Sequence, residues 1–189
     1  MNYDVIIIGA GPSGIFCAHE LKKYNKDMKV LIIEKGRSIE KRMCPKRKTK
    51  KCVNCVPCSI TTGFAGAGAF SDGKLSLSPD VGGNLPEILG YDETAKLIKE
   101  VDEVYLSFGA DTKIYGIDKE KEIEEIRKKA IGANLKLIEC PIRHLGTEEN
   151  LKILTKISLY LENKVDMIFG HKVSDIIVEE KQIKGIVME

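Results

Sequence analysis

The sequence has little net charge, no long apolar run near its start and no low-complexity tract. Its 30 Lys and Arg residues nearly balance its 28 Asp and Glu residues, and the net charge of +2 argues against nucleic acid or a membrane surface as a partner of the whole chain. The longest early apolar run, Val5–Ile8, is far too short to span a bilayer. The opening Met-Asn-Tyr-Asp lacks the basic region of a targeting segment. We therefore expect a cytoplasmic protein.

The composition is that of a globular protein with a buried core. Hydrophobic residues make up 43% and charged residues 31% of the 189 residues, a length that fits one domain or one domain with a small lobe. The charge is uneven, because residues 35–51 carry a net +8 and leave −6 for the rest. This basic run fits a solvated loop, or a docking surface for an acidic partner.

The first 34 residues read as strand, glycine turn, helix and strand. Val5–Ile8 is a continuous β-branched run, which is typical of a buried parallel strand. The glycine turn 9–14 follows, and apolar residues then recur at three-residue steps from Ile15 to Tyr24. A second buried strand, Val30–Ile33, ends at Glu34. The order predicts a βαβ unit that binds a dinucleotide.

The glycine spacing supports this prediction because each position has a physical role. In the G-x-G-x-x-G pattern, Gly9 permits a tight turn, Gly11 lets a pyrophosphate approach the backbone, and Gly14 lets helix and strand pack closely. The helix N-terminus offers N–H groups to phosphates. Glu34, 20 residues after Gly14, would bind ribose hydroxyls and repel a 2′-phosphate. Both FAD and NAD bind to such a unit, so an NAD-dependent dehydrogenase stays open.

The remainder of the chain predicts an α/β protein, with a Rossmann-like parallel sheet and an inserted, mainly helical lobe. We expect helices over 92–108, 118–130 and 147–163, and strands over 135–140, 165–169, 173–179 and 183–188. The last two strands would form a hairpin around residues 181–182. The boundaries follow as 1–78 and 146–189 for the nucleotide-binding domain, and 79–145 for a substrate or cap lobe.

Cysteines gather in the basic loop, in the pattern C-x7-C-x2-C-x2-C. The short spacings allow a 4Fe–4S cluster or a four-thiolate zinc site, whose charge the neighbouring lysines and arginines would offset. A redox dithiol and a loop of inert cysteines are the alternatives. The residues concerned are Cys44, Cys52, Cys55 and Cys58.

Several motifs together resemble a known family. The opening segment up to Gly14 resembles FAD-dependent oxidoreductases of the glutathione-reductase-like superfamily, as does Glu34–Arg37. The segments Gly66–Leu75 and His144–Thr147 resemble a bacterial family of FAD-dependent dehydrogenases within it. This resemblance covers most of the chain. Members of that family are longer and complete the flavin site late in their sequence, so the chain resembles their N-terminal part.

The resemblance implies a set of cofactor contacts. Phosphates would contact the glycine turn and Arg42, ribose would bind Glu34 beside Lys35, and adenine would contact the backbone of one late strand residue. The flavin or its phosphates would lie along the glycine-rich segment. The residues implied are Gly9, Gly11, Pro12, Ser13, Gly14, Glu34, Lys35, Arg42, Gly66, Gly68, Ala69 and Val173.

The function predicted is that of an FAD-dependent oxidoreductase or its FAD-binding portion. His144 is a candidate acid or base near the flavin, and Lys74 is a candidate contact of substrate or flavin. The structural alternatives are a local hydrogen bond for His144 and a surface charge at a turn for Lys74. A small-molecule substrate is expected, with NAD(P) as a co-substrate, an electron-transfer partner and an oligomer as open options. If the cysteines hold a cluster, electrons would pass between it and the flavin. The non-enzymatic alternative is a cofactor-binding or metal-binding module that acts through partners.

Overall fold

The computed structural model describes residues 2–189 and divides into two compact units. Unit 1 comprises the residues up to Ser71 together with Leu154–Glu189, and unit 2 comprises Asp72–Ile153. The domain boundaries after residues 78 and 145 stay a prediction. Between residues 2 and 189, no helix is both long and apolar enough to cross a bilayer.

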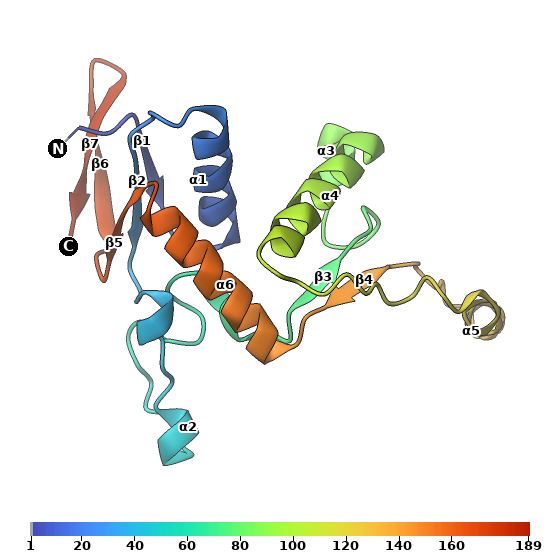
Figure 1. Cartoon of the computed structure of the whole chain (residues 1–189). Coiled ribbons are helices and arrows are strands. Elements are labelled where there is room, and N and C mark those ends of the chain that lie inside the picture. Colours follow the sequence, from blue (N-terminus) through green and yellow to red (C-terminus); the bar gives the residue numbers. More distant parts are fainter. Residues whose placement is uncertain (1) are drawn as a thin grey trace. The chain divides into compact units, whose positions relative to one another are not determined.

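Unit 1 contains a parallel sheet of β1 (Val5–Ile8), β2 (Val30–Glu34) and β5 (Asp166–Phe169), in the order β1-β2-β5 (Figure 1). The central strand, β2, is buried along its whole length, as its apolar run predicts. β1 is less covered than expected, because Ile8 at its end is 54% exposed. The predicted α/β class with a parallel sheet is confirmed.

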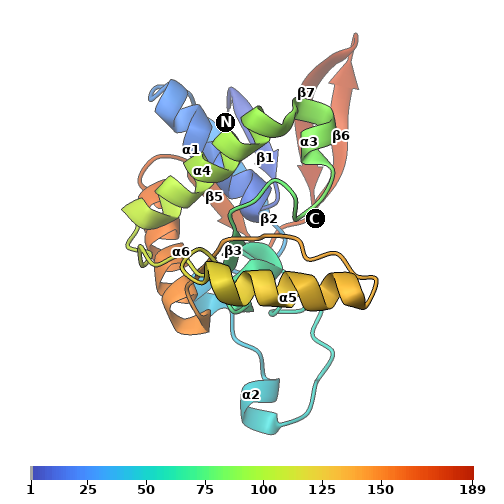
Figure 2. The same cartoon turned by 90° about the vertical axis from the view of Figure 1, so that its right-hand side faces the viewer.

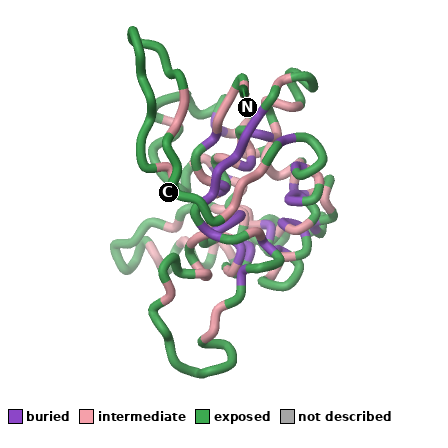
Figure 3. The backbone as a smooth tube through the Cα atoms, turned by 90° about the vertical axis from the view of Figure 1, so that its left-hand side faces the viewer, coloured by how far each residue is buried: buried purple, intermediate pink, exposed green. Residues whose placement is uncertain are grey.

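Helices of unit 1 bury apolar residues at the spacing that the sequence predicts. α1 (Pro12–Tyr24) packs on β1 and β2, with Ile15 and Ala18 buried. The part of α6 (Thr147–Glu162) that belongs to unit 1 buries Ile157 and Leu161. Figure 3 shows this buried interior along the sheet strands and the exposed segments around it.

Beyond β5 the chain forms the predicted hairpin, β6 (Val173–Glu179) and β7 (Gln182–Met188). Its turn lies at Glu180 and Lys181, one residue earlier than the sequence indicates, and both have left-handed φ values of 50° and 62°. Positive φ at both central residues gives the twist that a two-residue hairpin needs. Figure 3 shows most of this hairpin exposed.

Residues 35–71 of unit 1, which follow β2, form a long irregular segment. It contains only short helical turns: η1 (Ile39–Lys41), α2 (Lys46–Thr49) and η2 (Gly66–Phe70). α2 lies at the far end of a protruding loop (Figure 2). This loop, residues 43–58, carries most of the basic run and the clustered cysteines.

Unit 2 contains the antiparallel pair β3 (Lys74–Ser76) and β4 (Ile142–His144), together with α3 (Leu85–Leu89), α4 (Tyr91–Ser107) and α5 (Glu120–Gly132). The strand predicted at 135–140 is wrong. Leu135 and Ile138 in that segment are 67% and 50% exposed, and the strand forms at β4 instead, where β3 supplies its hydrogen-bonding partner.

A buried ion pair links α4 to β4 within unit 2. The guanidinium of Arg143 donates from Nε to Asp102 Oδ1 at 2.5 Å and from Nη2 to Oδ2 at 2.7 Å. Its Nη1 donates to the carbonyl of Asp111 at 2.5 Å. The hydrogen bonds to Asp102 raise the pKa of Arg143, so its guanidinium stays charged although the side chain is only 3% exposed.

Candidate nucleotide-binding site

The glycine turn joins β1 to α1 and leaves the start of the helix open. Gly9 has φ +101°, and its N–H donates to the Ile33 carbonyl at 2.7 Å. A Cβ at Gly14 would lie 2.0 Å from the Gly9 carbonyl oxygen, whereas one at Gly11 would meet nothing within 4 Å. No side chain caps α1 at Gly11. The turn therefore combines close helix–strand packing with open space at a helix N-terminus, the geometry that suits a phosphate.

Glu34, at the end of β2, is held beside this turn. Its carboxylate accepts hydrogen bonds from the backbone N–H groups of Ala10 and Gly36, each at 2.8 Å, and the residue is 6% exposed. Each carboxylate oxygen keeps a second lone pair for another donor. The two N–H groups thus fix the carboxylate while leaving it able to accept hydrogen bonds from hydroxyls.

A pocket of about 320 Å³ lies at the carboxyl ends of the parallel strands. Gly170, just after β5, donates its N–H to the carbonyls of Glu34 and Gly36 at 2.9 Å, which brings the chain after β5 to this edge. Open parallel sheets bind ligands at this edge. The pocket is lined by Ile8, Gly9, Ile33, Glu34, Lys35, His171, Lys172 and Val173.

The pocket brings together residues that the sequence indicates separately. Gly9, Glu34, Lys35 and Val173 all line it, although Val173 is far from the others along the chain. Sequence reasoning missed His171, whose Nδ1 lies 3.1 Å from the Phe169 carbonyl oxygen. Its position directly after a parallel strand was the available signal, because such residues lie at the carboxyl edge of the sheet.

The glycine-rich segment contacts the glycine turn. The Ala65 N–H donates to the Ala10 carbonyl at 2.7 Å, and a Cβ at Gly66 would lie 3.7 Å from Gly11 Cα and Pro12 Cδ. Within η2, Ala69 is buried, whereas a Cβ at Gly68 would meet nothing within 4 Å. The start of η2 therefore lies beside the turn.

Arg42 is engaged by the protein itself. It is 5% exposed, and its guanidinium donates to the carbonyls of Ser59 (3.0 Å), Ile60 (2.7 Å), Phe64 (2.5 Å) and Gly66 (2.7 Å). These bonds use four of the five N–H groups of an arginine. Burial lowers the pKa of Arg42, and the charge of Glu34 opposes that shift. The phosphate contact implied by resemblance stays a prediction that this geometry does not favour.

The clustered cysteines do not converge. Cys44 and Cys55 are half-buried, Cys52 and Cys58 are exposed, and all are free thiols. Within residues 2–189, no group of three or more His, Cys, Asp and Glu side chains is placed to hold a metal ion. This arrangement does not favour an iron–sulfur or zinc centre. Both centres stay predictions. Backbone hydrogen bonds from Ile60 and Thr61 lower the pKa of Cys58.

Both catalytic candidates lie in unit 2 as cross-strand neighbours. The β3–β4 register pairs Lys74 with His144, and Lys74 Nζ lies 2.8 Å from the Asp72 carboxylate. The hydrogen bond from Lys74 lowers the pKa of Asp72, and the charges of Lys74 and of protonated His144 lower it further. The His144 ring also contacts Tyr115 edge-on, with 6.3 Å between ring centroids. The two candidates therefore share one exposed polar cluster.

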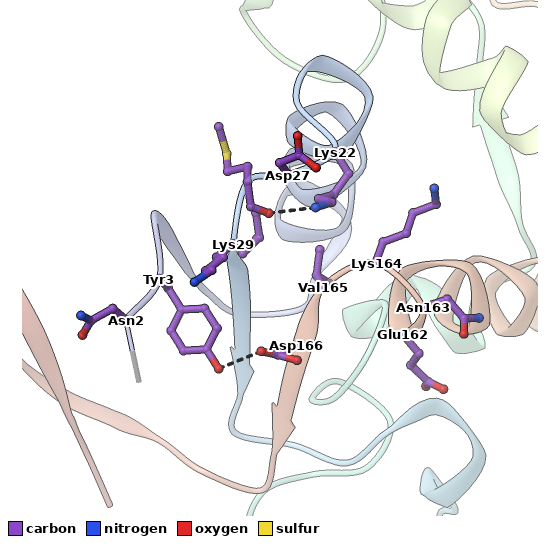
Figure 4. A pocket seen from close by; sticks show the side chains of 12 residues that line it. Asn2, Tyr3, Lys22, Asp27, Lys29, Glu162, Asn163, Lys164, Val165 and Asp166 are labelled. Carbon is purple, nitrogen blue, oxygen red and sulfur yellow. Dashed lines mark hydrogen bonds between the residues drawn. The ribbon is translucent and has the colours of Figure 1, made fainter.

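A larger pocket, of about 570 Å³, lies at the opposite, amino-terminal end of the same strands (Figure 4). The Tyr3 hydroxyl donates to Asp166 at 2.9 Å there, and Lys22 Nζ donates to the Met28 carbonyl at 2.8 Å. Both of these donors have partners within the pocket lining, and among the residues that the structure describes the lining includes neither a glycine nor the N-terminal turn of a helix. The smaller pocket is therefore the candidate nucleotide-binding site.

Comparison with known proteins relates the chain to oxidoreductases. Residues 3–188 match the family model described as pyridine nucleotide-disulphide oxidoreductase. A search of curated proteins gives no match. Many solved structures are similar in fold.

Two of these are 3-ketosteroid-delta4-(5alpha)-dehydrogenase from Rhodococcus jostii RHA1 (TM-score 0.55, 13% identity, covering 99% of this chain and 42% of that one) and L-amino acid deaminase from Proteus vulgaris (TM-score 0.52, 14% identity, 100% and 44%). A third is glycine oxidase from Bacillus cereus ATCC 14579 (TM-score 0.48, 15% identity, 99% and 53%). The chain thus spans about half the length of these solved chains. At identities of 13% and 14%, the likeness to the first two establishes the fold alone.

Proposed function

The chain belongs to the pyridine nucleotide-disulphide oxidoreductase family, and on this premise we propose that it is the part of an FAD-dependent oxidoreductase that binds the ADP half of FAD. When bound, the flavin supplies hydride or electron transfer, and the protein supplies its position and electrostatic surroundings. A small-molecule substrate and a cytoplasmic location belong to the same proposal.

The observation that carries the proposal is the pocket around Glu34 beside the open glycine turn. A carboxylate fixed by two backbone N–H groups suits the hydroxyls of a ribose, which donate hydrogen bonds to it. The exposed apolar side chain of Ile8 supplies a surface for the adenine ring. The uncapped start of α1 suits the pyrophosphate that follows the ribose.

The same carboxylate disfavours a nucleotide with a phosphate on the ribose. A 2′-phosphate would bring a second negative charge next to buried Glu34, so NADP is expected to bind much more weakly than NAD. NAD itself keeps the ADP half, and an NAD-dependent dehydrogenase therefore remains the second candidate. That candidate predicts a colourless protein that binds NAD more tightly than FAD.

Two measurements test the proposal. The visible spectrum of the purified protein is expected to show flavin bands, and the released cofactor is expected to be FAD. Calorimetric titration with ADP tests the ADP site even when flavin is lost during purification. No binding of ADP by well-folded protein would overturn the proposal.

The variant Glu34→Gln identifies the site. It removes the carboxylate that would accept the ribose hydroxyls, and ADP affinity is expected to fall roughly tenfold or more. Glu40→Gln is the matched control, because Glu40 is an exposed acid of η1 a few residues along the same chain segment. Equal ADP affinities of the two variants would contradict the assignment of ribose to Glu34.

The groups that act on substrate are a separate part of the proposal. Lys74 and His144 are proposed for the substrate side, because the β3–β4 register makes them neighbours. Their exposure leaves both side chains accessible to a ligand of unit 2. Their role requires the whole enzyme for a test, with kcat and KM compared for His144→Gln and Lys74→Met.

A further inference from the structure

Arg42 lies at the point where the cysteine-bearing loop meets the glycine-rich segment. We propose that Arg42 is a positioning residue: it holds the start of η2 against the glycine turn, so that the backbone there, and not the guanidinium, faces the pyrophosphate. This inference rests on the proposed ADP site. On this inference, Arg42 acts on phosphate binding through the backbone at the start of η2, and its guanidinium does not contact the phosphate.

Contacts from both sides hold residues 64–66 in place. On one side, Nη1 of Arg42 donates to the carbonyls of Phe64 and Gly66 at 2.5 and 2.7 Å. On the other side, the N–H of Ala65, the residue between them, donates to the Ala10 carbonyl at 2.7 Å. The short segment is therefore held between the guanidinium and the glycine turn.

The backbone of this segment adopts an unusual conformation. Ala65 and Gly66 have φ values of +65° and +57°, so two successive residues are left-handed. A residue with a Cβ rarely adopts this conformation unless the surroundings enforce it. Arg42 contributes to that enforcement, because its Nη1 donates to both carbonyls that flank Ala65.

Arg42 itself is held in position by other protein groups, independently of any ligand. Its stem packs so closely against residue 63 that a Cβ at Gly63 would lie 2.8 Å from Arg42 Cδ. Its guanidinium lies over the ring of Phe70, at the far end of η2, with 4.9 Å to the ring centroid. Arg42 thus contacts η2 at both its start and its end.

The remaining hydrogen bonds of Arg42 distinguish this role from that of a phosphate ligand. The two remaining bonds, to the carbonyls of Ser59 and Ile60, close the base of the loop 43–58. With these bonds made, the guanidinium is directed at protein carbonyls, and its charge is buried among them. A lysine keeps the charge but lacks the planar fork that reaches several carbonyls at once.

The experiment compares Arg42→Met and Arg42→Lys with the control Arg47→Met. Arg47 is an exposed arginine whose guanidinium also lies over the Phe70 ring, at 5.3 Å, so the control removes a similar contact without the carbonyl bonds. Hydrogen exchange is measured first, without ligand. Both Arg42 variants are expected to exchange the amide of Ala65 faster, while amides of β2 stay protected as in the wild type and in the control.

Ligand binding is measured next, with ADP and with adenosine as probes. Adenosine has no phosphate and reports on the Glu34 pocket alone. In both Arg42 variants ADP affinity is expected to fall roughly tenfold to hundredfold, the range for lost hydrogen bonds to a charged group, while adenosine affinity stays that of the wild type. The Arg47 control is expected to bind both like the wild type.

Each other outcome overturns the inference. If Arg42→Lys binds ADP like the wild type, the charge acts directly on the phosphate. If adenosine and ADP affinities fall together, or β2 loses protection, Arg42 is only a stabilising residue of unit 1. Wild-type protein that fails to bind ADP would refute the proposed function, whereas unchanged exchange at Ala65 would refute the positioning role on its own.

Discussion

Two glycines of the same turn are expected to respond differently to replacement by alanine. Gly14→Ala is expected to lower stability, and Gly11→Ala is expected to lower ADP affinity. A Cβ at Gly14 would lie 2.0 Å from the Gly9 carbonyl oxygen and 3.2 Å from Ile7 Cγ2, whereas a Cβ at Gly11 would meet nothing within 4 Å. The first substitution forces helix and strand apart. The second occupies only the open space that the pyrophosphate would use. Comparison of these two variants therefore distinguishes an effect of the turn on folding from an effect on ADP binding.

The magnitudes follow from these distances. Relief of the Gly14→Ala overlap needs a backbone shift, because the nearest atom is a carbonyl oxygen and not a flexible side chain. Overpacking of this kind costs about 3 kcal/mol or more, and the melting temperature is expected to fall by roughly 6 °C or more. Gly11→Ala has an ordinary φ of −72°, and its stability is expected to stay within about 1 kcal/mol of the wild type.

The assay combines thermal melting with calorimetric titration of ADP. Gly11→Ala is expected to melt like the wild type and to lose ADP affinity roughly tenfold or more, because its methyl group keeps the phosphates from the helix N-terminus. Gly14→Ala is expected to melt early. If Gly11→Ala binds ADP like the wild type, phosphates do not lie at this turn. If Gly14→Ala melts like the wild type, the close approach of α1 to β1 is wrong.

Further predictions concern unit 2 and the cysteine loop. Asp102→Asn leaves the buried guanidinium of Arg143 without its charged partner, and unit 2 is expected to lose about 3–5 kcal/mol of stability, measured by denaturant unfolding; an unchanged unfolding curve would contradict the burial of this pair. The lowered pKa of Cys58 predicts that its thiolate persists to lower pH than that of a free cysteine, so a pH series of iodoacetamide labelling read by mass spectrometry should show an early onset. Thr61→Val removes a hydroxyl that contributes to this shift, and the onset should move to higher pH; an onset that does not move would show that the hydroxyl is not involved.

The sequence allowed the βαβ unit to be predicted because its signals are local. The buried run Val30–Ile33, the glycine spacing and Glu34 at the strand end each reflect a requirement met within a few residues. Of the helices of unit 2, α4 and α5 were predicted within two residues of their observed bounds for the same reason, whereas α3 was not predicted. The family of oxidoreductases was indicated by longer motifs, and the match over residues 3–188 confirms it.

The features that could not be predicted depend on contacts between distant segments. The role of Arg42 follows from where residues 59–66 fold back, which no periodicity in the sequence encodes. The strand at 135–140 was predicted from its apolar residues, but strand formation required a partner, and β3 pairs with Ile142–His144 instead. His171 follows a strand that the sequence predicted, but its place in the pocket also depends on the pairing of β5 with β2, which the sequence does not specify.

The most direct test of the central claim is a crystal structure of the chain with ADP bound. We expect ADP to occupy the pocket at the carboxyl ends of the strands. Its ribose hydroxyls should lie within hydrogen-bonding distance of the Glu34 carboxylate, and its phosphates should lie at the N-terminus of α1 beside Gly11. ADP at the opposite pocket near Tyr3 and Asp166, or with its ribose away from Glu34, would contradict the proposed ADP site.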